Sequence, residues 1–114
     1  MYANGVVWCM LFIETPVFTR QIAALVDDET YAKLQWDLAN DPELGDVIPG
    51  TGGLRKIRVS AKGKGKRGGA RVIYFCLVSA SRIAMLLAYP KNAKDDLDAD
   101  EKKALAKIIK SWRT

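Results

Sequence analysis

Residues 50 to 74 read GTGGLRKIRVSAKGKGKRGGARVIY. Two strand-like runs, 54 to 60 and 70 to 79, lie on either side of a loop of Gly, Lys and Arg. Between Leu54 and Arg71 there are eight cations and no acidic residue. This hairpin concentrates positive charge, although its second strand is apolar and must be buried. Such a concentration of charge requires a polyanionic partner. We therefore interpret the rest of the chain as a scaffold for this hairpin.

The length and composition predict a single globular domain over residues 1–114. The chain is 49% hydrophobic and 27% charged, and it is long enough to bury a core of its own. It contains no run of 18 apolar residues, and the apolar run at 6–13 lacks the basic start and cleavage site of a signal peptide. We therefore expect a cytoplasmic protein with no membrane partner. Residues 1–9 are a candidate N-terminal extension.

Cysteine and histidine usage excludes several kinds of chemistry. The two cysteines, Cys9 and Cys76, both lie in apolar runs, which favours buried reduced thiols over a disulfide or a metal site. The chain has no His, so a His-activated nucleophile, a His-ligated metal and a His-based acid and base are all excluded. We expect no metal and no cofactor.

Charge is divided unevenly along the chain. Residues 1–53 carry eight acidic residues and two cations, a balance of −6. Residues 54–114 carry sixteen cations and five acidic residues, a balance of +11. This asymmetry indicates that the second part of the sequence meets a polyanion, without deciding between DNA, RNA and a membrane surface.

Hydrophobic periodicity predicts an α+β protein whose helices cover a sheet. Thr15 and Pro16 are typical of a helix start, and Asp27 and Asp28 separate that helix from a second one. Asp98 resembles the first residue of a capping box before a Leu/Ile stripe. The predicted order is β-α-α-β-β-β-α: strand 6–14, helices 16–26 and 27–39, a turn-rich connector at 42–53, strands 54–60, 70–79 and 82–89, and a helix from residue 98.

Two glycine motifs inside the basic hairpin do not carry their usual meaning. Residues 63–68 spell G-x-G-x-x-G, but a strand follows them instead of a helix, and no acidic residue lies about twenty positions later. Residues 65–68 match the G-x-x-G of KH domains, which joins two helices. We reject both the dinucleotide site and the KH domain.

The alternation of side chains along strands predicts one basic face. Lys56 and Arg58 project to the same side of their strand, Tyr89 and Lys91 share a side at the end of theirs, and Arg71 begins the central strand. These five residues form the predicted reaction face. Further cations are predicted to contact a nucleic-acid backbone: Arg55, Lys62, Lys64, Lys66 and Arg67.

The sequence resembles a known family in four places. They are the stretch from Gly50 to Val59, the stretch from Gly63 to Tyr74, the Tyr-Pro-Lys-Asn at 89–92, and the acidic-capped C-terminal helix. Together they resemble the HigB branch of the RelE-like toxins of type II toxin–antitoxin systems, over about 11–112 of the chain.

The resemblance implies a fold, an activity and partners. It implies helices packed on one side of a small, mainly antiparallel sheet. It implies an endoribonuclease that enters the ribosomal A site, contacts ribosomal RNA there, cleaves mRNA and so inhibits translation. A cognate antitoxin, expected to be a helix-turn-helix protein encoded nearby, would neutralise it.

The resemblance also assigns site positions. Lys56 and Arg58 match two cations on the strand before the basic loop, and Arg71 matches the Arg that begins the next central strand. Some relatives place His or acidic residues after the last strand. At those positions this chain offers Tyr89, Lys91 and either Asn92 or Lys94.

Cleavage of RNA by its own 2′-hydroxyl needs a base, an acid and cations around the phosphorane. We hypothesise that Lys56 is the base, since clustered cations favour a neutral lysine, and that Arg58 and Arg71 hold the scissile phosphate. Lys91 or Tyr89 would supply the acid or orient the substrate. Lys64, Lys66 and Arg67 would dock on ribosomal RNA.

Two alternatives remain. The first is a non-catalytic nucleic-acid-binding module that uses the same hairpin. A DNA reader is disfavoured because the two helices at 16–39 are acidic and no basic recognition helix is visible. The second is an inactive toxin-fold protein that serves only as a partner of its antitoxin.

Overall fold

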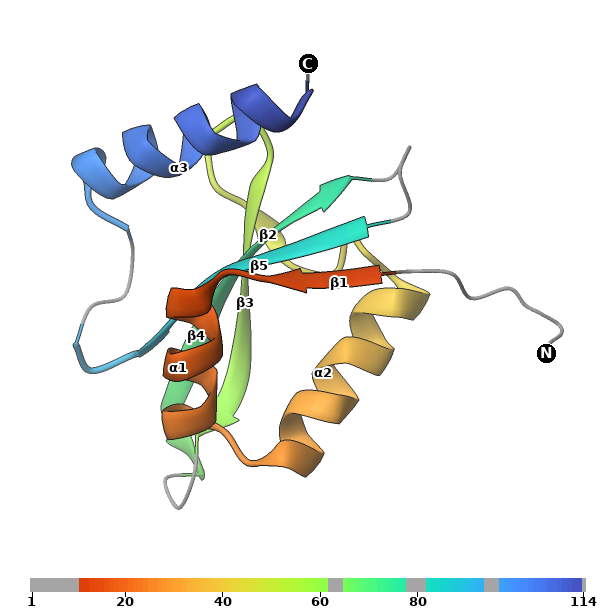
Figure 1. Cartoon of the computed structure of the whole chain (residues 1–114). Coiled ribbons are helices and arrows are strands. Elements are labelled where there is room, and N and C mark those ends of the chain that lie inside the picture. The colour runs from red at the N-terminus through yellow and green to blue at the C-terminus, as the bar shows by residue number, and fades with distance from the viewer. Residues whose placement is uncertain (1–10, 62–64, 78–81, 94–96, 114) are drawn as a thin grey trace, which may run out of the picture.

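The computed structural model describes residues 11–61, 65–77, 82–93 and 97–113. Within them the strands form one sheet in the order β1-β5-β4-β3-β2, covered by three helices (Figure 1). β1 runs parallel to β5, and the other neighbouring strands are antiparallel. The α+β class and the mainly antiparallel sheet are confirmed. The elements are β1 (Leu11–Glu14), α1 (Pro16–Leu25), α2 (Asp28–Asn40), β2 (Asp46–Val47), β3 (Leu54–Ala61), β4 (Gly65–Leu77), β5 (Arg82–Pro90) and α3 (Ala99–Arg113).

Thr15 starts α1 and fastens it to the sheet. Its Oγ1 accepts a hydrogen bond from the Phe18 N–H at 3.0 Å, and Pro16 occupies the first turn, as predicted. The same hydroxyl donates to the Leu86 carbonyl of β5 at 2.9 Å. Gln21 accepts from the Ala88 N–H at 2.9 Å, beyond the point where β1 ends. The helix therefore satisfies the edge of β5 that β1 leaves open.

The helices α1 and α2 build a first core on one face of the sheet. Asp27 caps α2 by accepting from the Thr30 N–H at 2.8 Å. Apolar side chains of both helices recur every three or four residues and pack on alternate residues of the strands. This first core contains Phe18, Ile22, Leu34 and Leu38 from the helices, with Val72, Tyr74, Ile83 and Met85 from the sheet.

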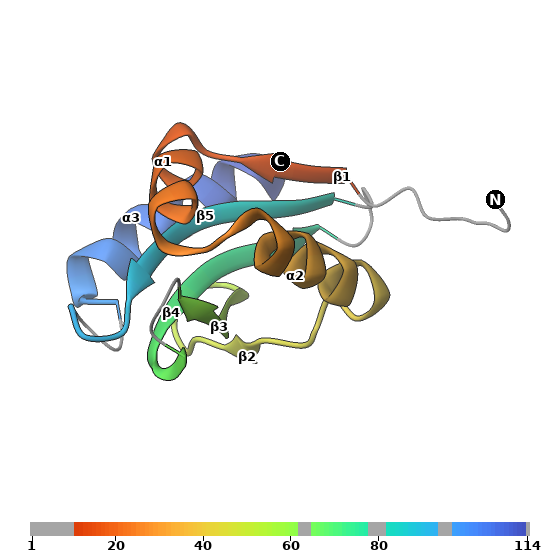
Figure 2. The same cartoon turned by 90° about the horizontal axis from the view of Figure 1, so that it is seen from below.

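A second core lies between the sheet and α3, on the opposite face. Ile73 and Phe75 alternate with the β4 residues of the first core, and they pack with Leu105 and Ile109 of α3. Figure 2 shows α1 and α2 in front of the strands and α3 behind them. The expectation that all helices lie on one side is therefore wrong, because the C-terminal helix buries its own apolar stripe against the other face.

The basic hairpin is longer than its composition indicates. β3 extends to Ala61 and β4 begins at Gly65, with Ala61 opposite Gly65, so residues 65–69 form a strand where a loop was predicted. Glycine and lysine give no apolar signal, but backbone pairing requires none. The connector at 42–53 also contains the two-residue strand β2, which the expected element order lacks.

Some predictions fall outside the described residues. These are the strand at 6–10 with Cys9, the loop cations Lys62 and Lys64, the end of the strand at 78–79, and Lys94. Cys76 is a free thiol but is only half-buried, and this burial raises its pKa above the ordinary value. No helix in the described part of the chain combines the length and the apolar character needed to cross a membrane.

Candidate active site

Three side chains from three adjacent strands form a row across the sheet. In the antiparallel ladder Arg58 of β3 lies opposite Arg71 of β4, and Arg71 lies opposite Tyr89 of β5. Residues directly opposite each other in such a ladder point to the same face. Tyr89 belongs to the second core, so the row lies on the face that α3 partly covers. The predicted grouping of these three residues is therefore reproduced by the register.

A pocket of about 240 Å³ opens beside this row. Lys91 enters it from the turn after β5, where its N–H donates to the Gly69 carbonyl at 2.9 Å. That backbone bond ties the turn to the base of the hairpin. The lining consists of Arg58, Val59, Ser60, Gly69, Arg71 and Lys91. Three of the five predicted reaction-face residues thus share one pocket.

The cations of the pocket differ in how far they are exposed to solvent. Arg71 is 4% exposed, and it is the one buried charged side chain among the residues whose exposure the structure describes. Arg58 and Lys91 are exposed. Two like charges directly opposite each other on a sheet repel, and an anion between them removes that repulsion. A phosphate can therefore be held by one rigid guanidinium, Arg71, and by cations that close on it from solvent.

Lys56 lies on the same face but one step away from the pocket. It is two residues before Arg58 on β3, which corresponds to about 7 Å along a strand. Its neighbours in the ladder are Ile73 of β4 and Asp46 of β2. Lys56 is half-buried and is not among the pocket's lining residues. The structure thus brings Lys56 near the row without placing it in the pocket.

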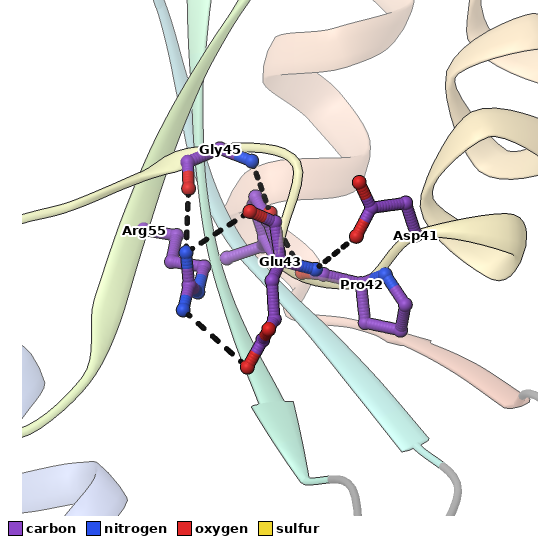
Figure 3. A network of polar contacts seen from close by, with 6 residues as sticks. Asp41, Pro42, Glu43, Gly45 and Arg55 are labelled. Atoms are coloured by element: carbon purple, nitrogen blue, oxygen red, sulfur yellow. Dashed lines mark hydrogen bonds and ion pairs between the residues drawn. The ribbon is translucent and has the colours of Figure 1, made fainter.

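Arg55 lies on the opposite face and holds the connector after α2 (Figure 3). Its Nη1 donates to the Gly45 carbonyl at 2.7 Å and to the Glu43 carbonyl at 3.1 Å. Its Nη2 lies 3.8 Å from the Glu43 carboxylate. Alternation along β3 separates Arg55 from Lys56. Arg55 therefore lies on the face of β3 opposite to Lys56 and Arg58.

The same connector approaches Tyr74 of β4 closely. The Tyr74 hydroxyl accepts from the Gly45 N–H at 2.8 Å and donates to the Pro42 carbonyl at 2.9 Å. A Cβ at Gly45 would lie 2.9 Å from both the Tyr74 ring and the Lys56 carbonyl, so this approach requires glycine. Burial raises the pKa of Tyr74 above the ordinary value. These contacts fix β2 beside the strand that carries Lys56 and Arg58.

One family model matches the part of the chain that builds this site. The model is described as the RelE toxin of the RelE/RelB toxin–antitoxin system, and it matches residues 39–114. This range covers the connector, β2 to β5 and α3, including every residue of the row and the pocket. The chain belongs to the RelE toxin family. RelE toxins are generally endoribonucleases that inhibit translation by cutting mRNA, and each has an antitoxin partner.

The RelE family assignment confirms the coarser part of the resemblance, and the HigB branch stays a prediction. The remaining predicted docking cations of this RelE toxin are not placed. Lys66 and Arg67 lie in β4, but their side chains are outside the description, as are Lys62 and Lys64 entirely.

Three lining residues of the RelE pocket, Val59, Ser60 and Gly69, were missed from the sequence. Ser60 follows Arg58 by two positions, so strand alternation indicated its place on the same face. Gly69 was read as part of a loop, and only the backbone bond from Lys91 reveals that it borders the pocket.

Proposed function

We propose that this RelE-family toxin cuts mRNA bound in the ribosomal A site. The observation that carries the proposal is the cross-strand row of Arg58, Arg71 and Tyr89 with Lys91 beside it. One buried guanidinium and two exposed cations around a small open pocket suit a single phosphodiester that is strained toward a phosphorane. A module that only held an RNA backbone would not need a buried Arg, because exposed cations supply that binding.

In the proposed reaction, the 2′-oxygen of the nucleotide attacks the adjacent phosphorus. A base removes the 2′-hydroxyl proton as the new P–O bond forms. The bond from phosphorus to the 5′-oxygen then breaks, and an acid protonates that oxygen. The products are a 2′,3′-cyclic phosphate and a 5′-hydroxyl. Arg58 and Arg71 stabilise the additional negative charge on the phosphorane oxygens.

Exposure supports an assignment of the acid and the base. Tyr89 is 5% exposed and packs in the second core, so its hydroxyl is poorly placed to follow a leaving oxygen. Lys91 is exposed and lines the pocket, so we assign it as the acid and Tyr89 as a positioning residue. Lys56 remains the proposed base, on the same face and within reach of a substrate that extends along β3.

The partners follow from the same proposal. The ribosome would hold the mRNA with its 2′-hydroxyl aligned, because the pocket alone is small and open. The cognate antitoxin, proposed to be a helix-turn-helix protein of the HigB-associated type, would neutralise the toxin by covering its surface. The toxin would meet both the ribosome and the antitoxin in the cytoplasm.

The test compares two exposed arginines on different strands of the sheet, one at the pocket and one away from it. Arg58→Ala is expected to reduce ribosome-dependent mRNA cleavage by about 10²-fold or more, the usual cost of losing a preorganised donor. Arg82→Ala removes an exposed Arg from β5, far from the pocket lining, and should cleave like the wild type. Cleavage is measured on programmed ribosomes by mapping mRNA ends. Thermal unfolding checks that both variants fold.

Equal cleavage by Arg58→Ala and wild type would overturn the site assignment. A wild-type chain that binds ribosomes without producing new mRNA ends would support the non-catalytic module. A wild-type chain that binds its antitoxin but not ribosomes would support the inactive partner protein.

A further inference from the structure

The helix α3 carries a row of lysines that the pocket does not use. Lys102, Lys103, Lys107 and Lys110 fall within an arc of about 140° at 100° per residue, and they extend over about 12 Å of helix. We call these four residues the lysine row. Leu105 and Ile109, which face the sheet, lie outside this arc. The lysine row therefore forms one continuous cationic side of α3.

A groove runs between this side of α3 and the glycine turn before β3. Its volume is about 530 Å³. Gly50, which lines the groove, has a φ of 76°, and a Cβ there would meet nothing within 4 Å, so the turn leaves the groove open at this point. The groove is lined by the lysine row with Pro49, Gly50, Ala99 and Ala106.

The two carboxylates that cap α3 do not pair with the lysine row. Asp98 accepts from the Glu101 N–H at 2.8 Å, and Glu101 accepts from the Asp98 N–H at 3.0 Å. This capping box engages both carboxylates with the helix's own amides. Within the described residues, no ion pair involves any lysine of the row.

Three of the four lysines of the row lie at positions that are unfavourable for helix stability. Lys102 and Lys103 lie near the N-terminal end of α3, where the helix dipole disfavours cations. Lys103 and Lys107 are like charges four residues apart, which also destabilises a helix. Lys110 lies in the last turn of α3, where the dipole favours a cation, so these costs apply to the other three lysines. A polyanion in the groove would remove both costs.

We infer that the lysine row and the glycine turn form a second RNA site that docks the toxin on ribosomal RNA. The groove lining contains no large apolar side chain, which a protein helix would need as an anchor, whereas a phosphodiester backbone needs only cations. The lining shares no residue with the reaction pocket, so the RNA bound here is not the segment that is cut. The lysine row and the reaction pocket lie on the same side of the sheet, so one ribosomal surface can contact both. The inference rests on the proposed function, since it names the RNA that carries the toxin to its substrate.

The experiment measures binding to ribosomes over a range of salt concentrations. Lys103→Gln with Lys107→Gln removes two charges from the row and keeps residues that favour a helix. The matched control is Arg20→Gln with Lys33→Gln, which removes two exposed charges from α1 and α2 on the other face. The row variant should bind roughly tenfold more weakly at ~100 mM salt, and its log–log salt slope should be smaller by roughly one to two. The control should match the wild type.

The outcomes separate this inference from the proposed function. If the wild type cuts mRNA on the ribosome and the row variant has the wild-type affinity and slope, the docking site is wrong and the proposed function stands. If the wild type cuts nothing, the proposed function is wrong, and the same salt-dependent binding measurement on purified ribosomal RNA decides the inference. Weaker binding by the row variant supports the inference, and equal binding overturns it. A row variant that loses affinity for the antitoxin but not for RNA also overturns it.

Discussion

Tyr31 connects α2 to β1 through a single hydroxyl. It donates a hydrogen bond to the Glu14 carboxylate, which also accepts from the Thr19 hydroxyl at 2.7 Å. Burial raises the pKa of Tyr31 far above the ordinary 10.0, and the hydrogen bond to Glu14 and its charge raise the pKa further. The native state therefore holds the neutral phenol more strongly than the unfolded chain does.

Tyr31→Phe tests this connection through its pH dependence. A pKa that is higher in the folded state gives stability that is fully present below pH ~10 and is lost as the pH rises. At pH 11 the unfolded phenol is mostly ionised, so the wild type should lose about 1.4 kcal/mol through this group and Tyr31→Phe should not. Urea unfolding of both proteins at pH 8 and pH 11 measures the difference. A stability gap between them that does not change with pH would contradict the assignment.

At the same scale, the residues of the site differ in how readily the sequence predicts them. Strand alternation places Lys56 and Arg58 together, and it also separates Arg55 from them, although charge alone groups all three. The alignment of Arg58, Arg71 and Tyr89 depends on the register of two ladders, which no single strand specifies. The exposure of Lys91 and the burial of Tyr89 depend on α3 and the turn after β5. These tertiary contacts leave no local signal.

Among the elements, α1 is held by two hydrogen bonds of the Thr15 hydroxyl, one accepted from the helix and one donated to β5. Thr15→Ala removes both the N-cap of α1, which accepts from the Phe18 N–H, and the hydrogen bond to the Leu86 carbonyl. It should therefore destabilise the protein by about 1–3 kcal/mol. Thr15→Ser keeps both bonds and should lie within about 0.5 kcal/mol of the wild type. Asp27→Ala removes the cap of α2 without a bond to the sheet, and it should cost about 1 kcal/mol.

Urea unfolding of the three variants measures these costs. A loss in Thr15→Ala no larger than that in Asp27→Ala would show that the bond to β5 contributes nothing beyond capping.

The elements themselves show where local sequence is informative. The helices begin at residues with capping side chains, and these starts were predicted within about one residue. β2 is two residues long, too short for any period to be visible. Residues 65–69 lie in β4, where Gly65 pairs with Ala61, and their composition of Gly, Lys and Arg gives no apolar pattern that would indicate a strand. The lysine row has a helical period that the sequence contains, but its place beside the glycine turn depends on how α3 packs.

In the whole molecule, β4 belongs to both cores, so the two cores should unfold together. Ile109 is 1% exposed between α3 and the sheet, and Ile109→Ala should cost about 2–4 kcal/mol. Ile108 is 42% exposed on the same helix, and Ile108→Ala should cost less than about 1 kcal/mol. Urea unfolding followed by circular dichroism gives both values.

Amide exchange in α2, on the far side of the sheet, tests the coupling itself. If one transition governs the chain, as expected for one domain, Ile109→Ala lowers the protection of α2 by the same free energy that it removes from the whole protein. Unchanged protection of α2 would show that the two faces unfold independently.

The parallel pairing of β1 with β5 sets an order of events during synthesis. Thr15, directly after β1, bonds to Leu86, which lies 71 positions later in the chain. The first strand therefore has no partner in the sheet until β5 has left the ribosome that makes it. Arg58, Arg71 and Lys91 come together over the same interval, and α3 closes the second core last. A nascent chain thus assembles the pocket of Arg58, Arg71 and Lys91 only near the end of its own translation. Under the proposed function, this delay would protect the ribosome that makes the chain and would give an antitoxin made alongside it time to bind.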